Sequence, residues 1–272
     1  MPISRRHIFA GAVAAPVAAA GVARAAAAAK PSTFVLVHGA WHGSWCWKRV
    51  RATLQAQGHR VFTPTLTGLC ERSHLLTREV NLSTHVNDVV NLIRWEELSN
   101  VVLLGHSYGG AVISGAAEAA PERIGALVYL DAFVLKNGQG VLDSLPPGGK
   151  EQQLELAKTA GEGWKLPPAP AAFFNVNTAD RAWVDHQCTP QPLATFTEPL
   201  KLTGAGDRIK DVTYLRASDW TGSPFPPFYE MAKARGWRAK EIVSGHDVML
   251  DQPARLADEL AAIGARVDGP KA

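Results

Sequence analysis

VVLLGHSYGG, residues 101–110, decides the fold, because it reads as a buried strand that ends in a sharp turn before a helix. Four apolar residues lead into a G-x-S-x-G sequence, and the small-residue run AVISGAAEAA follows. The middle residue of such a turn has a strained backbone, and its side chain stands clear of the sheet. The plainer interpretation is a Gly-rich turn with an incidental serine. With a strand before it and a helix after it, we predict that Ser107 is a nucleophile.

The composition suits one globular domain with a full core. The chain has 272 residues, of which 46% are hydrophobic and 19% are charged. Three of its 28 basic residues lie in the first 25 positions, which hold no acid, and the other 25 balance the 25 acidic residues. A mature chain of near-zero net charge gives no electrostatic support for binding to nucleic acid or to an anionic membrane, so we expect neither partner.

The cysteines and histidines do not form a recognisable metal or disulfide pattern in the sequence. Three cysteines, Cys46, Cys70 and Cys188, are too few for a disulfide framework, and none lies in a C-x-x-C pair. A bridge between Cys70 and Cys188 stays open. The nine histidines show neither H-E-x-x-H nor Cys/His spacing, so we predict no metal site.

Residues 1–30 have the features of an export signal and a linker. Two arginines at positions 5 and 6 precede an Ala-rich apolar stretch that ends in ARA, a cleavage-like site. The pair resembles a twin-arginine signal, which would deliver a folded protein to the bacterial periplasm after cleavage near Ala25. The alternatives are an ordinary secretory leader and a membrane anchor. The apolar run is too short and too rich in alanine for a comfortable span, so we expect no stable membrane association after cleavage.

Strands and helices alternate along the rest of the chain. Continuous apolar runs such as FVLV indicate strands that are buried on both faces. The alternation predicts a mostly parallel six-stranded sheet flanked by helices. The predicted strands cover residues 34–37, 60–64, 101–104, 126–130, 212–216 and 239–243, and the predicted helices cover 44–57, 84–98, 111–120, 228–235 and 253–263.

The alternation breaks down between about Phe133 and Leu200, where prolines cluster in LPPGG, LPPAPAAFFN and CTPQP. We interpret this segment as a cap over the carboxyl edge of the sheet, with a short helix around 151–159. Its aromatic residues either pack the cap on the core or line an apolar acyl pocket. The resulting division is a core of residues 31–133 and 201–266, a cap of residues 134–200 and a C-terminal tail of residues 267–272.

A nucleophilic serine needs a base and a group that orients the base. His246 follows the last predicted strand, so it lies at the same edge of the sheet as Ser107. Two carboxylates follow strands and could complete the set, Asp219 after the penultimate strand and Asp131 after the strand that follows the turn. We prefer Asp219, because of its place in the chain order serine, acid, histidine.

Two backbone amides are expected to stabilise the charge of a tetrahedral intermediate. The turn supplies that of Tyr108, and the loop after the first strand supplies that of Ala40. The candidates for the substrate pocket are Trp41, His42, Phe133 and Trp183.

Four segments together resemble the α/β-hydrolase superfamily: FVLVHGAWHGSWCW at 34–47, GHSYGG at 105–110, LVYLDAF at 127–133 and SGHDVML at 244–250. The likeness is greatest to plant methylesterases and hydroxynitrile lyases and to their bacterial esterase relatives. It implies an α/β-hydrolase fold without a cofactor. It also implies a triad of Ser107, Asp219 and His246, with Ala40 and Tyr108 as oxyanion donors.

Two departures favour an esterase over a lyase. The lyases tend to have a threonine after the first strand's histidine and a lysine after the catalytic one, whereas this chain has Gly39 and Asp247. The turn also reads GHS, as in the esterases. We therefore predict a serine carboxylesterase that cleaves small to medium, mainly uncharged esters through an acyl-enzyme. The alternatives are a hydroxynitrile lyase or other non-hydrolytic enzyme, or a small-ligand binding protein with a residual triad.

Overall fold

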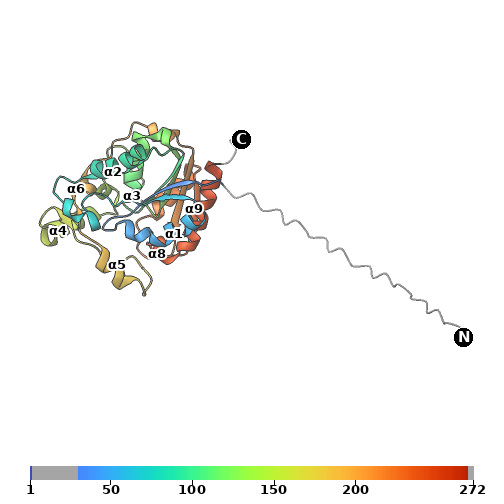
Figure 1. Ribbon diagram of the computed structural model, residues 1–272. Coiled ribbons are helices and arrows are strands. Elements are labelled where there is room, and N and C mark those ends of the chain that lie inside the picture. Colours follow the sequence, from blue (N-terminus) through green and yellow to red (C-terminus); the bar gives the residue numbers. More distant parts are fainter. Residues whose placement is uncertain (2–29, 269–272) are drawn as a thin grey trace.

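The computed structural model describes Met1 and residues 30–268, and it is built around a six-stranded parallel sheet (Figure 1). The strand order is β2-β1-β3-β4-β7-β8, and each neighbouring pair is parallel. The predicted α/β fold is therefore confirmed. The strands are β1 (Thr33–Val37), β2 (Arg60–Phe62), β3 (Val101–His106), β4 (Ile124–Leu130), β7 (Asp211–Ala217) and β8 (Arg238–Ile242).

Burial along the strands follows their position in the sheet. All six residues of the inner strand β3 are buried, as its run of valine and leucine requires when helices cover both faces. The edge strand β8 has the sequence RAKEI and buries only Ile242. Its charged side chains deter pairing of this edge with another chain.

Helices cover the two faces of the sheet. Val35 and Val37 of β1 enter one hydrophobic cluster, with α2, α3 and α7, while Phe34 and Leu36 enter another, with α1, α8 and α9. This division reflects the two-residue repeat of a strand. The helices are α1 (Lys48–Ala56), α2 (Leu82–Trp95), α3 (Gly109–Ala119), α7 (Pro226–Ala234), α8 (Val248–Asp251) and α9 (Pro253–Val267).

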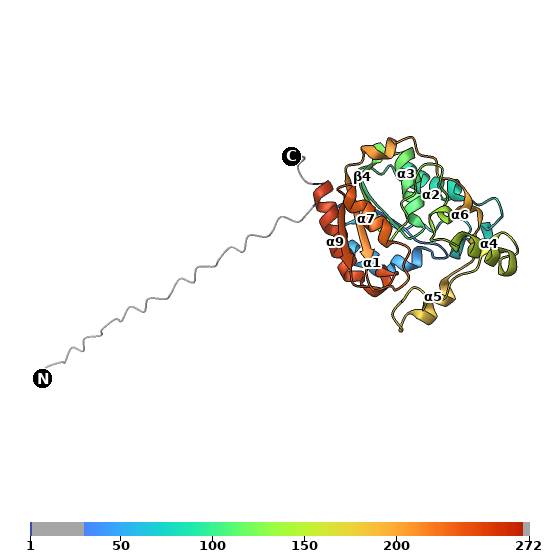
Figure 2. The ribbon, with the colours of Figure 1, turned by 180° about the vertical axis from the view of Figure 1, so that it is seen from behind.

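The segment expected to form the cap contains short elements at the side of the molecule opposite α9 (Figure 2). The helix expected around 151–159 is α4. A small antiparallel pair, β5–β6, was not predicted, because strands of two residues are too short to show a periodicity. The elements are α4 (Gly149–Ala160), β5 (Lys165–Leu166), α5 (Arg181–Gln187), β6 (Gln191–Pro192) and α6 (Ala194–Thr197).

The start of α2 differs from the prediction by two residues. The Thr84 amide donates to Asn81 Oδ1 at 2.9 Å, and the Asn81 amide donates to Thr84 Oγ1 at 3.3 Å. This reciprocal cap begins the helix at Leu82, two residues before the predicted start at position 84. The segment between β2 and α2 also contains a 3₁₀ helix over Cys70–Leu75.

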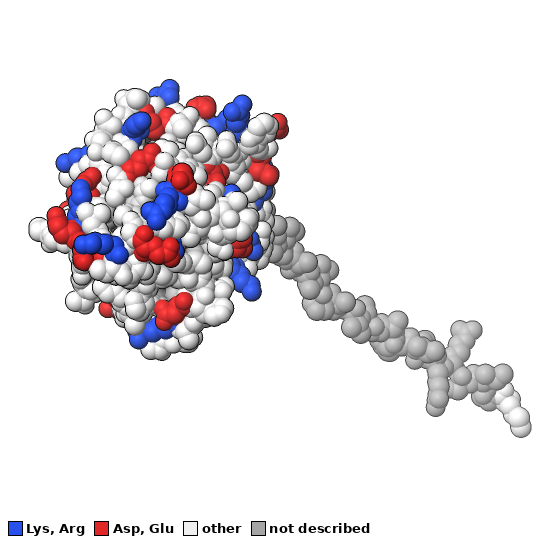
Figure 3. Space-filling model, turned by 90° about the vertical axis from the view of Figure 1, so that its left-hand side faces the viewer, with Lys and Arg blue, Asp and Glu red and all other residues white. Residues whose placement is uncertain are grey.

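The surface agrees with the balanced charge of the sequence. Basic and acidic side chains are interspersed on the face shown in Figure 3. Within residues 30–268, no helix combines the length and apolar character needed to cross a bilayer. The expected export signal and its cleavage near Ala25 lie outside the described residues.

Candidate active site

Ser107 lies on the turn between β3 and α3 and has a φ of +53°, in the left-handed region that side chains seldom adopt. Two neighbouring positions accept only glycine. A Cβ on Gly105 would lie 2.3 Å from the Gly109 carbonyl oxygen, and one on Gly109 would lie 2.7 Å from that of His38. The predicted strand–turn–helix is therefore confirmed, and it leaves Ser107 partly exposed between buried neighbours.

His246 lies in the loop between β8 and α8, beside this turn. Its Nδ1 is 2.7 Å from Asp131 Oδ2, and its ring centroid is 4.4 Å from that of His106, the residue before Ser107. Its backbone amide donates to the Phe174 carbonyl at 2.9 Å. The structure thus brings the predicted base to the carboxyl edge of the sheet, where its ring packs against His106, the residue before the predicted nucleophile.

The carboxylate on His246 belongs to Asp131 and not to Asp219, which corrects our preference. Asp131 follows β4 directly, is fully buried and accepts from the Ala217 amide at 3.2 Å. Asp219 is exposed, and its backbone amide donates to the Ser244 carbonyl at 3.0 Å. Both residues satisfy the chain order, but β4 adjoins β3, whereas β7 is one strand further from the serine.

Burial favours the neutral form of each member of this pair. It lowers the pKa of His246 from 6.5 to about 4, an effect that the Asp247 carboxylate opposes and the His42 charge reinforces. Burial also raises the pKa of Asp131, against the hydrogen bond from the Ala217 amide. A neutral His246 that donates Nδ1–H to Asp131 Oδ2 keeps Nε2 free to accept a proton.

The two amides predicted as oxyanion donors lie on adjoining segments. A Cβ on Gly39 would lie 3.0 Å from Ser107 Cβ, so the loop after β1 packs directly on the turn. His38 braces this loop, since Nδ1 contacts the Gly39 carbonyl at 2.8 Å and Nε2 accepts from the Leu66 amide at 3.0 Å. Among the described residues, the amides of Ala40 and Tyr108 donate to no backbone or side-chain acceptor.

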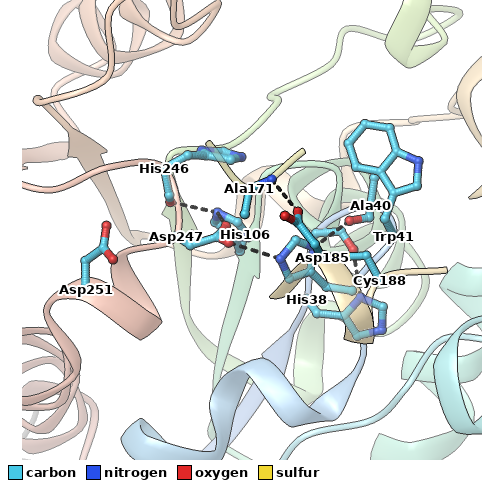
Figure 4. Close-up of polar contacts among 12 residues, drawn as sticks. His38, Ala40, Trp41, His106, Ala171, Asp185, Cys188, His246, Asp247 and Asp251 are labelled. Carbon is cyan, nitrogen blue, oxygen red and sulfur yellow. Dashed lines mark hydrogen bonds and ion pairs between the residues drawn. The ribbon is translucent and has the colours of Figure 1, made fainter. Parts of the chain in front are cut away.

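Two of the four predicted pocket residues lie near the turn. The Phe133 amide donates to the Ser107 carbonyl at 3.2 Å, and the Phe133 ring meets Phe225 edge-on. Trp41 has a φ of +64°, and its backbone amide donates to Gln191 Oε1 at 3.2 Å. Trp41 Nε1 also donates to the Leu166 carbonyl at 3.1 Å. Trp41 therefore joins the loop after β1, residues 38–43, which we call the oxyanion loop, to the β5–β6 pair. Figure 4 shows Trp41 beside Ala40 in this loop.

The other two predicted pocket residues lie elsewhere. His42 is 3% exposed, with Nδ1 at 2.8 Å from the Ala40 carbonyl and Nε2 at 3.1 Å from Asp247 Oδ2. Trp183 packs edge-on against Trp45, which stacks on His42. The buried His42 ring lies behind the loop after β1, whereas Trp45 and Trp183 line a hollow together with Arg49 and Asp180.

Three aromatic residues surround His246. Its ring centroid lies 4.6 Å from that of Trp220, 5.3 Å from that of Phe225 and 5.4 Å from that of Phe174. Phe174 lies in the LPPAPAAFFN stretch of the predicted cap, whereas the sequence gives no sign that Trp220 and Phe225 belong to the site. They come from the loop after β7, and only the tertiary fold brings them to the histidine.

One group of described residues has the donor atoms of a metal site. Donor atoms of His106, His246 and Asp247 lie within 4.8 Å of one another. Each residue of the group already makes one such contact, because His106 Nε2 donates to the His246 carbonyl, His246 Nδ1 faces Asp131, and Asp247 Oδ2 faces His42. We therefore assign these residues to a hydrogen-bond network.

Known proteins resemble this chain over most of its length. The model of the alpha/beta hydrolase family matches residues 34–259. A carbendazim-hydrolysing esterase of Nocardioides sp. (strain SG-4G) is 44% identical over 86% of this chain and 100% of its own length. Methylesterase 10 of Arabidopsis thaliana is 30% identical over 86% of this chain and 92% of its own length. An extracellular alpha/beta-hydrolase from a Paenibacillus species, described as a structural and functional homologue of tobacco salicylic acid binding protein 2, has a TM-score of 0.76 and 25% identity, covering 86% of this chain and 99% of its own.

Proposed function

The chain belongs to the alpha/beta hydrolase family, and on this premise we propose that it is a serine carboxylesterase with Ser107 as its nucleophile. One observation carries the proposal. A serine with a φ of +53° on a strand–turn–helix shares one edge of the sheet with a histidine whose Nδ1 is 2.7 Å from a buried carboxylate. Together these residues supply a nucleophile, a base and an orienting group.

The reaction has two halves. In the first, His246 Nε2 removes the Ser107 hydroxyl proton as Oγ attacks the ester carbonyl carbon. The amides of Ala40 and Tyr108 donate to the resulting oxyanion, and Asp131 stabilises the imidazolium. The ester C–O bond then breaks, and His246 gives its proton to the departing alkoxide. In the second half, His246 takes a proton from water as the water oxygen attacks the acyl carbon. The bond from that carbon to Ser107 Oγ then breaks, and His246 returns the proton to Oγ as the acid leaves.

The substrate class follows from the surroundings of the base and from the relatives. Trp220, Phe225 and Phe174 surround His246, and such aromatic surfaces suit an uncharged, partly aromatic ester. The 44% identical relative is named for the hydrolysis of carbendazim, a methyl carbamate of a benzimidazole. We propose methyl esters and methyl carbamates of planar aromatic groups as the first substrates to test.

The experiment compares wild type with Ser107→Ala on p-nitrophenyl acetate and carbendazim. We expect wild-type turnover of at least about 1 per second on one of them. In the variant, kcat should fall by about four orders of magnitude or more. Ser114→Ala is the matched control, since Ser114 is a buried serine of α3 that bonds to Gly110 and Tyr129. Full activity in Ser107→Ala would reject the mechanism, and negligible turnover of every ester would favour a binding protein.

We also propose that the chain is exported to a bacterial periplasm and cleaved near Ala25. The paired arginines and the ARA sequence support this. The mass of the periplasmic protein tests it, because a chain that begins close to position 26 is expected. Recovery of only the full-length chain, in the membrane fraction, would contradict the proposal.

A further inference from the structure

A buried polar cluster lies directly behind the proposed site and takes no part in its proton transfers. It consists of His42, His106 and Asp247, which we call the clasp. Their exposed fractions are 3%, 1% and 0%, and Figure 4 shows His106 and Asp247 beneath His246. His42 Nε2 is 3.1 Å from Asp247 Oδ2, and His106 Nε2 is 3.9 Å from Asp247 Oδ1.

The hydrogen bonds of His42 indicate its charge. Nδ1 is 2.8 Å from the Ala40 carbonyl oxygen, which only accepts, so Nδ1 carries a proton. Nε2 faces a carboxylate oxygen, which also accepts when Asp247 is ionised. Burial works against both charges, but the Cys188 sulfur and the Asp247 carboxylate raise the pKa of His42 well above 6.5, and His42 keeps the pKa of Asp247 low. The pair is therefore an imidazolium and a carboxylate.

Each member of the clasp is tied to a different part of the proposed machinery. His42 binds the carbonyl of Ala40, whose amide is an oxyanion donor. Asp247 follows the base in the chain. His106 precedes the nucleophile, and its Nε2 donates to the His246 carbonyl at 3.0 Å. Two loops and the end of β3, all distant in sequence, thus meet at this cluster.

The clasp retains unpaired polar atoms, which a purely stabilising cluster would avoid. Within the described chain, Asp247 Oδ1 and His106 Nδ1 are buried without a hydrogen-bond partner. Such atoms are costly in the interior, and replacing a buried ion pair by apolar groups is often neutral or stabilising. An arrangement that costs stability suggests a role in positioning.

We infer that the His42–Asp247 ion pair positions the oxyanion loop and the His246 loop around Ser107, so that its loss lowers kcat without a matching change in KM. This inference rests on the proposed function. His42 and Asp247 are positioning residues and do not touch the substrate. Because the two residues carry opposite charges, the two single substitutions should destabilise the protein to different extents. Asp247→Asn leaves a neutral His42, whereas His42→Gln leaves a buried carboxylate without a counter-charge.

The test is a double-mutant cycle of wild type, His42→Gln, Asp247→Asn and the double variant. Urea unfolding midpoints and kcat and KM on p-nitrophenyl acetate are measured for each protein. We expect His42→Gln to have the lowest midpoint, and the double variant to regain part of the loss. Asp247→Asn should fold and lose about tenfold or more in kcat, since small misplacements in a site are costly. The matched control is the exposed Lys233–Glu230 pair, where both glutamine variants should behave like wild type.

A spectroscopic readout tests the charge state independently of activity. In ¹⁵N-histidine-labelled wild type at about pH 8, one imidazole should have both nitrogens protonated, and this signal should be absent from Asp247→Asn. The inference is wrong if the changes in urea midpoint of the single variants add up in the double variant. It is also wrong if the spectra of wild type show only neutral imidazoles, or if folded Asp247→Asn has an unchanged kcat. If His42→Gln does not fold, the double variant and Asp247→Asn still test the inference. If wild type lacks Ser107-dependent turnover, the proposed function fails, whereas the midpoints and spectra still test the ion pair.

Discussion

Replacing Asp131 with asparagine should lower kcat by a large factor, whereas the same change at Asp219 should not. The two variants therefore distinguish the two candidate acids. The carboxylate faces two donors, because Oδ1 accepts from the Ala217 amide at 3.2 Å and Oδ2 lies 2.7 Å from His246 Nδ1. Asparagine offers one acceptor oxygen, so its NH₂ group must face one of the two. If it faces His246, the imidazole adopts the tautomer with its proton on Nε2, which cannot accept from Ser107.

The expected loss in kcat for Asp131→Asn is about 10⁴-fold, or about 5.4 kcal/mol of transition-state stabilisation at 1.36 kcal/mol per factor of ten. Asp219→Asn is the matched control. Its side chain is exposed, so kcat should change by less than about threefold, or about 0.65 kcal/mol.

Initial rates on one aryl ester, with circular dichroism to confirm folding, provide the assay. A large loss in Asp219→Asn together with near-normal turnover in Asp131→Asn would refute the assignment of Asp131.

Three further outcomes follow from burial and close packing. Because burial lowers the pKa of His246 to about 4, the acid limb of kcat/KM should lie well below pH 6.5, and a limb at 6.5 or above would contradict this. Burial also lowers the pKa of His38 to about 3 and that of His85 to about 4, so below pH 6.5 the unfolded state binds more protons than the folded state. The unfolding free energy should therefore fall between pH 6.5 and 4, by about 1 kcal/mol per pH unit for each histidine, and a flat urea-unfolding profile would argue against buried neutral imidazoles. Gly39→Ala would place a Cβ 3.0 Å from Ser107 Cβ, so kcat should drop about tenfold or more in steady-state assays, and an unaffected kcat would show that the loop yields easily.

Local features were predictable from the sequence, because neighbouring residues determine them. The strand–turn–helix around Ser107 depends on an apolar run, glycines at fixed offsets and a small-residue helix, all within 101–120. The six strands were predictable from similar short-range patterns. The start of α2 was predicted two residues too late, because the Asn81 cap begins the helix at Leu82.

Long-range pairings were not predictable in the same way. Chain order allowed both Asp131 and Asp219, and only the sheet order brings Asp131 to His246. The His42–Asp247 pair joins residues 205 positions apart, and nothing in the sequence near either residue indicates the other.

The most direct measurement of the central claim is the identity of the atom that attacks an ester-like electrophile. Wild type and Ser107→Ala would be treated with an organophosphate, and the modified peptide mapped by mass spectrometry. We expect one phosphoryl group per chain, on Ser107, with loss of esterase activity in wild type and no adduct in the variant. Inactivation by modification of another residue, or full esterase turnover with Ser107 phosphorylated, would contradict the claim.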